Sequence, residues 1–174
     1  MKNDIRDTIK AIYVDGQPNT AVDPGSARKI AGTVTPAVGA VGGTEVTSHV
    51  CTDDRAEFRS ITYGTTCAVA LDVFVKVPGS GHELVIQFSK LGRYACLYWR
   101  KAGHLGVWFT YNPPKGWHED SVSETREAVR GLGFHVLSNA ELDEPYVGIP
   151  DAFASHDEDY ASVRSLLFCF DGAH

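Results

Sequence analysis

The sequence contains no long apolar stretch. Its longest uninterrupted run of apolar side chains is six residues, from Tyr94 to Trp99, whereas a helix that spans a membrane needs about 20. The first ten residues carry Asp4 and Asp7 at positions where a secretory signal peptide would need an apolar segment. These absences exclude a membrane-spanning helix and predict a soluble, cytoplasmic protein with no membrane partner.

Cysteine is scarce and irregularly spaced. The four residues, Cys51, Cys67, Cys96 and Cys169, include no CxxC pair, so the spacing predicts neither a zinc site nor a redox pair. Cys67, Cys96 and Cys169 lie within apolar runs, where a cysteine usually behaves as a small hydrophobic side chain. We therefore expect reduced core cysteines, no disulfide and no bound metal.

Catalytic sequence motifs are missing as well. The chain has no HExxH, GxSxG, Walker or GxGxxG pattern, and the glycine-rich stretch 39–43 lacks the Lys-Ser/Thr pair that a phosphate loop needs. The sequence thus predicts a protein that is not an enzyme and binds no cofactor. One alternative stays open, a small hydrolase or nuclease that uses scattered His, Cys and acidic groups. In that case His82 and His104, which follow turns, would converge at one sheet edge.

Length and composition indicate a single domain over residues 1–174. Of the 174 residues, 43% are hydrophobic and 22% are charged, as is typical of one globular domain. A chain of this size buries about two-thirds of its unfolded surface, so it needs neither a metal nor a disulfide to fold.

Four segments in the middle of the chain predict an antiparallel sheet. Alternating or continuous apolar residues mark strands over residues 67–77, 84–89, 94–100 and 105–111. Turns of a few residues connect them, whereas parallel strands would need crossovers of about a dozen residues or more. We therefore expect a four-strand meander in sequential order.

The region before the meander is only partly readable. Residues 3–14 carry isoleucines at helical spacing, which predicts an amphipathic helix: Ile5, Ile9 and Ile12. Residues 17–48 show no strong period, although short strands such as Ile30 to Val34 are expected there. The structure of residues 17–66 as a whole cannot be assigned from the sequence.

Two capping boxes predict helix starts after the meander. In Ser121 with Glu124, and in Ser138 with Glu141, a hydroxyl stands three residues before a carboxylate, and each side chain can bond the other residue's backbone amide. We expect Gly131 or Gly133 to end the first of these helices in a left-handed conformation.

The last segments complete the predicted fold. Residues 134–137 are typical of a short strand, and residues 160–170 fit a helix, with a strand over 166–170 as the alternative. Together with the first helix, this pattern predicts an α+β fold in which N- and C-terminal helices flank a central antiparallel sheet.

The negative charge is concentrated in residues 141–174. The chain carries a net charge of −6, and this segment holds eight acidic residues against one base, Arg164. Such a segment is either a solvated end or a surface that faces a basic partner, whose association it would accelerate. It would also repel the phosphates of a nucleic acid.

A second cluster combines aromatic and basic residues near the end of the meander. Aromatic side chains beside cations can stack bases, but they can equally form the core or anchor a protein interface. The cluster consists of Arg93, Tyr94, Tyr98, Trp99, Arg100, Lys101, Trp108, Tyr111, Lys115 and Trp117.

The C-terminal third carries a resemblance to a known group of proteins. Leu137-Ser138, then Glu141-Leu142 and Pro145, then Leu166-Leu167-Phe168 resemble the tails of small bacterial immunity proteins of polymorphic-toxin and contact-dependent growth-inhibition systems. The resemblance implies a cytoplasmic, non-enzymatic inhibitor that binds and neutralises a cognate toxin, often a basic nuclease. The partner-binding residues would then be acidic ones of this segment: Glu141, Asp143, Glu144, Asp157, Glu158 and Asp159.

Overall fold

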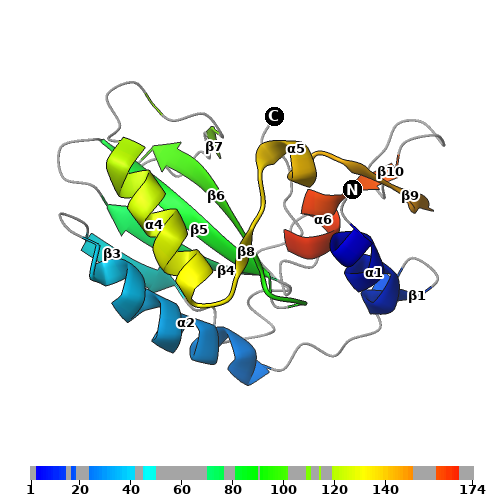
Figure 1. Cartoon of the computed structure of the whole chain (residues 1–174), viewed down its shortest axis with the longest axis horizontal. Helices are drawn as coiled ribbons and strands as arrows, with labels where there is room; N and C mark the ends of the chain where they lie inside the picture. The colour runs from blue at the N-terminus through cyan, green and yellow to red at the C-terminus, as the bar shows by residue number, and fades with distance from the viewer. Residues whose placement is uncertain are drawn as a thin grey trace.

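The computed structural model has an α+β fold built around one mixed sheet (Figure 1). It describes residues 3–14, 17–18, 24–41, 45–49, 70–76, 81–89, 91–101, 109–110, 114, 119–150 and 160–168. Among these residues, no helix has the length and apolar character needed to cross a bilayer.

The central strands follow one another through the sheet in sequence order. They are β3 (Glu45–His49), β4 (Ala70–Lys76), β5 (His82–Ser89), β6 (Tyr94–Lys101) and β7 (Phe109–Thr110), and every neighbouring pair is antiparallel. The predicted four-strand meander is therefore confirmed as β4 to β7, while residues 67–69, 77, 105–108 and 111 of its predicted strands lie outside the described residues. Strand β3 extends it on the β4 side, in the region whose structure the sequence left unassigned.

One short strand adds a parallel pairing. Strand β8 (His135–Val136) lies beside the first residues of β6, with Tyr94 opposite His135 and Ala95 opposite Val136. It is the short strand predicted within residues 134–137. Since β7 pairs with Trp99 and Arg100, β7 and β8 border the same strand near its opposite ends.

Helix α2 (Pro24–Gly39) corrects one sequence-based expectation. Residues 30–34, expected as a short strand, lie in the middle of this helix. Its interior Pro36 and its β-branched residues weaken the helical signal, but Ala31, Val34 and Val38 share one buried face against the sheet. Tertiary packing thus overrides a weak local propensity.

Helices α2 and α4 (Glu119–Gly131) cover one face of the sheet (Figure 1). Side chains of β4, β5 and β6 that point to this face are almost completely buried. This first core includes Val73, Val75, Leu84, Ile86, Phe88, Ala95, Leu97 and Trp99 from the strands.

Helix α4 begins before the predicted cap residue Ser121, and its C-terminal stop is at Gly133. Ser121 lies within the helix, two residues after its start, and its carbonyl accepts a hydrogen bond from the buried Thr125 hydroxyl, so it is not the N-cap. At the other end, Gly133 has φ +83°, its N–H donates to the Arg130 carbonyl, and the next N–H donates to Val129. This is a Schellman stop, and it assigns the left-handed position to Gly133 rather than Gly131.

Helices α1 (Asn3–Ile12) and α6 (Val163–Phe168) build a second core on the other face, at the end where β6 begins. The three isoleucines of α1 are at most 5% exposed, as the helical spacing predicted. They pack with Tyr94 and Cys96 of β6 and with four residues of α6. A hydrogen bond of 2.6 Å from the Tyr13 hydroxyl to the Leu166 carbonyl joins the two segments.

A hairpin, a short helix and a strand pair complete the described part of the structure. Strands β1 (Tyr13–Val14) and β2 (Gln17–Pro18) form a hairpin after α1. Helix α5 (Asn139–Leu142) precedes the antiparallel pair β9 (Pro145–Pro150) and β10 (Tyr160–Ser162), which we call the C-terminal ladder. The helix predicted over residues 160–170 is thus correct for 163–168, whereas 160–162 form a strand.

The second core gives a direct test of this packing. Replacing Ile9, which is fully buried, by alanine should lower the free energy of unfolding by about 2–5 kcal/mol, because the cavity adds to the lost transfer energy. The control Lys10→Ala, on the exposed side of the same helix, should change it by less than about 0.5 kcal/mol. Urea denaturation measures both. Equal effects would contradict the docking of α1 on the sheet.

Candidate functional site

The predicted capping box at the start of α5 is present and engages Glu141. The Ser138 hydroxyl accepts from the Glu141 N–H at 3.3 Å, and the Glu141 carboxylate accepts from the Ser138 N–H at 2.8 Å and from its hydroxyl at 2.8 Å. The Glu141 side chain is only 18% exposed. This carboxylate therefore orients α5 besides carrying charge.

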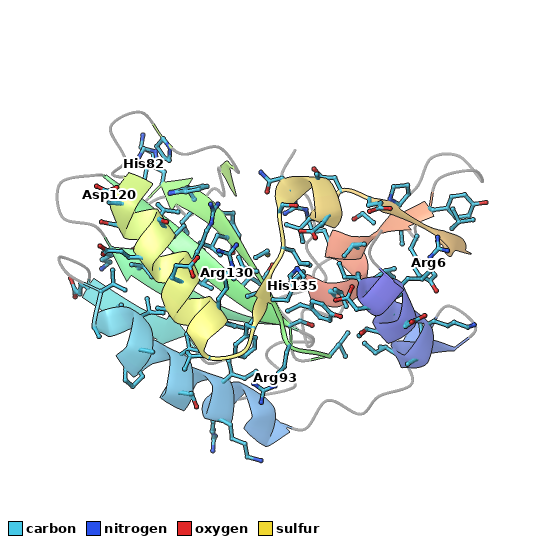
Figure 2. The ribbon with its side chains drawn as sticks, in the orientation of Figure 1. Arg6, His82, Arg93, Asp120, Arg130 and His135 are labelled. Carbon is cyan, nitrogen blue, oxygen red and sulfur yellow. The ribbon has the colours of Figure 1, made fainter. Side chains whose placement is uncertain are left out.

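His135 of β8 (Figure 2) lies near two carboxylates from different elements. Its Nε2 is 3.8 Å from Glu141 Oε1, and its Nδ1 is 3.9 Å from Asp4 Oδ2 on α1. His135 and Glu141, together with Arg130 of α4, line an open groove of about 520 Å³. Because both charge signs meet in this groove, it has no clear preference for an anion or a cation.

Asp143 forms an ion pair with Arg164 of α6. Its Oδ1 accepts a hydrogen bond of 2.8 Å from the Arg164 guanidinium on α6, the one basic residue of the acidic segment. The Arg164 side chain is 9% exposed and that of Asp143 is 67% exposed. Asp143 thus neutralises a buried cation while most of its own surface faces solvent.

Two large apolar side chains of the C-terminal ladder are exposed. Tyr146 and Ala161 point inward to the second core, so their neighbours Val147 and Tyr160 point outward. Val147 is 68% and Tyr160 is 42% exposed, and they are the large hydrophobic residues with the greatest exposure in the described part of the chain. Glu144, which is half-buried, directly precedes β9.

The six candidate binding residues therefore fall into two groups. Glu141, Asp143 and Glu144 lie together around α5, at the entrance to the ladder. Asp157, Glu158 and Asp159 lie outside the described residues, and in the sequence they directly precede β10. The sequence identified these acids by charge alone. The exposed Val147 and Tyr160 were missed, because local sequence does not distinguish them from core residues.

The aromatic members of the aromatic and basic cluster are internal where the structure describes them. Tyr94, Tyr98 and Trp99 are at most 7% exposed, which leaves no stacking platform at these three positions. Arg100 lies 3.8 Å above the Phe74 ring, and its Nε donates to the buried Glu83 carboxylate at 2.7 Å. These residues stabilise the sheet. Trp108, Tyr111, Lys115 and Trp117 lie outside the described residues.

The residues considered for catalysis or metal binding are mostly dispersed. His82 begins β5, opposite Lys101 of β6, while His104 lies outside the described residues. Cys96 is buried, and its thiol lies 3.7 Å from Gln87 Oε1, which agrees with the expected core role. Cys51, Cys67 and Cys169 lie outside the described residues. Where the structure describes side chains, no three or more His, Cys, Asp or Glu are grouped as a metal site.

Comparisons of the chain with protein-family models, curated proteins and solved structures found no match. The surface around α5 and the C-terminal ladder is therefore the candidate binding site.

The Asp143–Arg164 pair should contribute more to the free energy of unfolding than the exposed Glu127–Arg130 pair. Asp143→Asn should lower the free energy of unfolding by about 1–2 kcal/mol, between the values for exposed and buried pairs. Glu127→Gln, which removes the carboxylate that pairs with the 51% exposed Arg130 side chain, should cost less than about 0.5 kcal/mol. Denaturant titration of both variants measures the difference. A neutral Asp143→Asn variant would show that the pair does not hold α5 to α6.

Proposed function

We propose that this protein is a non-enzymatic inhibitor of the immunity type, which binds a cognate basic toxin domain through its acidic C-terminal surface. We define this surface as Glu141, Asp143 and Glu144 with the exposed Val147 and Tyr160, continued in the sequence by Asp157, Glu158 and Asp159. The observation that carries the proposal is the exposure of Val147 and Tyr160 on a ladder whose flanking sequence is strongly acidic.

Exposed apolar side chains on the ladder support binding of a protein. An exposed tyrosine is typical of the centre of a protein interface, where a few side chains that become buried dominate the binding energy. Charged residues around such a centre usually form the rim and act on the association rate. The ladder exposes Tyr160 and Val147, and Asp143 and Glu144 directly precede its first strand.

The charge of the surface supports a basic partner. No lysine or arginine stands between Glu141 and Tyr160 in the sequence, whereas seven acidic residues do, counting Glu141 itself. Such a surface attracts a domain that itself carries a positive face for nucleic acid, and it repels the nucleic acid. The resemblance to immunity proteins supports a toxin that acts on nucleic acid as this partner.

The test begins with capture of the partner by the tagged chain from cells of its source, followed by purification of the captured protein. At low salt, the triple variant Asp157→Asn, Glu158→Gln, Asp159→Asn should associate with it about tenfold more slowly than the unmodified chain, with a weaker salt dependence. The matched control Asp120→Asn, Glu124→Gln, Glu127→Gln removes three exposed carboxylates from α4 and should stay within about twofold. Stopped-flow fluorescence measures both rates.

A second variant tests the apolar centre of the surface. Tyr160→Ala should raise the dissociation rate about tenfold or more, as expected for the loss of a central aromatic side chain, and the captured toxin should regain activity at equimolar inhibitor. Equal rates for all variants, or a captured partner whose activity the chain does not inhibit, would reject the proposal.

A further inference from the structure

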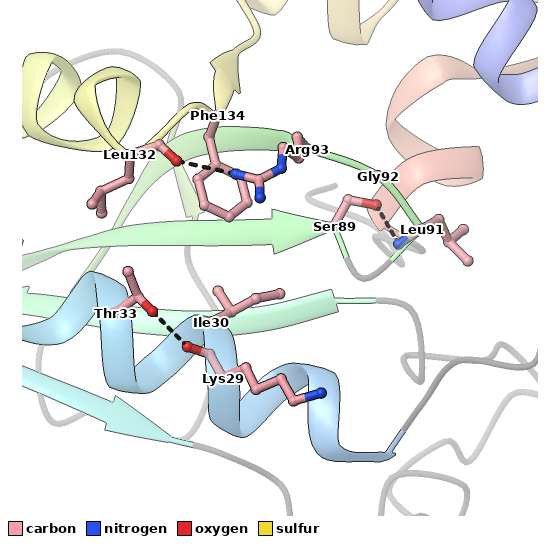
Figure 3. Close-up of a pocket in the computed structure, with 9 residues that line it drawn as sticks. All are labelled: Lys29, Ile30, Thr33, Ser89, Leu91, Gly92, Arg93, Leu132 and Phe134. Carbon is pink, nitrogen blue, oxygen red and sulfur yellow. Dashed lines mark hydrogen bonds between the residues drawn. The ribbon is translucent and has the colours of Figure 1, made fainter.

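A second surface feature lies away from the C-terminal ladder, at the end of the first core (Figure 3). It is an open pocket of about 390 Å³ between α2, the turn that joins β5 to β6, and the segment that follows α4. Its apolar walls come from Ile30 of α2, Leu91 of the turn, and Leu132 and Phe134 after α4. A pocket of this size and character is typical of small-molecule sites, which measure about 300–1,000 Å³.

The Schellman stop of α4 positions one wall of this pocket. It directs the Leu132 carbonyl toward the turn, where it accepts a hydrogen bond of 3.2 Å from Arg93 Nη1. The same guanidinium lies 5.9 Å from the centre of the Phe134 ring, which itself packs edge-to-face on Phe88 at 4.9 Å. Arg93 is thus held at the pocket with several N–H donors still available to a ligand.

Gly133 is needed for this arrangement. Besides its positive φ, a Cβ at this position would approach Arg93 Nη1 to 3.2 Å. Any side chain here would strain the helix end and crowd the guanidinium that the pocket holds.

The pocket has a charge opposite to that of the whole chain. Among the described residues that line it, Lys29 and Arg93 are charged and none is acidic, although the protein has a net charge of −6. The buried Ser89 and the Thr33 hydroxyl add polar groups at the wall. Two cations beside an apolar cavity complement a ligand that carries a negative group on an apolar body.

We propose that this pocket binds a small organic anion, a carboxylate with an aromatic or branched aliphatic body. The carboxylate binds Arg93 and Lys29, and the apolar body packs on Ile30, Leu132 and Phe134. This site is separate from the acidic C-terminal surface and does not depend on the proposed inhibitor function.

The probe for the test is 4-phenylbutyrate, with 4-phenylbutan-1-ol as its neutral analogue and acetate as the anion without the apolar body. Titration into the ¹⁵N-labelled chain should move the amide resonances of Ile30, Gly92, Arg93 and Phe134, with a Kd on the order of 1 mM or lower for the carboxylate. The alcohol should bind about tenfold more weakly, and acetate should cause no saturable shift at these positions.

Two substitutions and one control locate the anion. Arg93→Gln should weaken 4-phenylbutyrate binding about tenfold, the ratio expected for loss of one charge-assisted hydrogen bond. Thr33→Trp, at an exposed position of α2 that lines the pocket, should fill the cavity and abolish binding without changing the core. Arg28→Gln removes an exposed cation of the same helix that does not line the pocket, and it should leave the Kd unchanged.

Several outcomes would overturn the proposal. Equal affinity for the acid and the alcohol would mean that the cations do not recognise the ligand. Equal weakening by Arg28→Gln and Arg93→Gln would indicate general attraction to the surface. Resonance shifts that map outside the pocket, or none at probe concentrations of about 20 mM, would exclude the site.

Discussion

The structure depends on the burial of β5 and β6 on both of their faces. From Glu83 to Ser89 and from Tyr94 to Trp99, every side chain is buried, so each face needs its own cover. Helices α2 and α4 supply one layer, and α1 with α6 supply the other where β6 begins. Polar groups on the second face are satisfied within the sheet, as Glu83 is by Arg100. Because α6 must dock there, β10 and its partner β9 are held at the edge of the molecule, where Val147 and Tyr160 face solvent.

Two of the acidic residues stabilise this packing. Glu141 closes the capping box of α5, and Asp143 neutralises the buried Arg164 of α6. Their charges therefore contribute to folding, so neutralising them would alter stability as well as any interface. The acids just before β10 offer the cleaner test of binding. At the end of α4, the Schellman stop holds Arg93 beside Phe134, and this local cationic site contrasts with the negative C-terminal segment.

The sequence predicts the parts of this fold that have a strong local period. The meander, the isoleucine face of α1 and the capping box of α5 are examples, because each depends on side chains within a few residues of one another. Helix α2 was missed since Pro36 and its β-branched residues obscure a face that only the sheet makes apolar. Ser121 looked like a cap because the motif alone does not show where a helix begins. The parallel pairing of β8, the burial of Arg164 and the exposure of Tyr160 arise from long-range packing, so no local pattern reveals them.

The central claim is that the C-terminal ladder is the surface that meets a partner. Hydrogen–deuterium exchange of the chain, alone and with the protein that it captures, tests this claim most directly. Binding should slow exchange at residues 143–148 and 160–162 and leave the amides of α2 and β3 unchanged. Slower exchange over α2 or β3, with no change in the ladder, would contradict it.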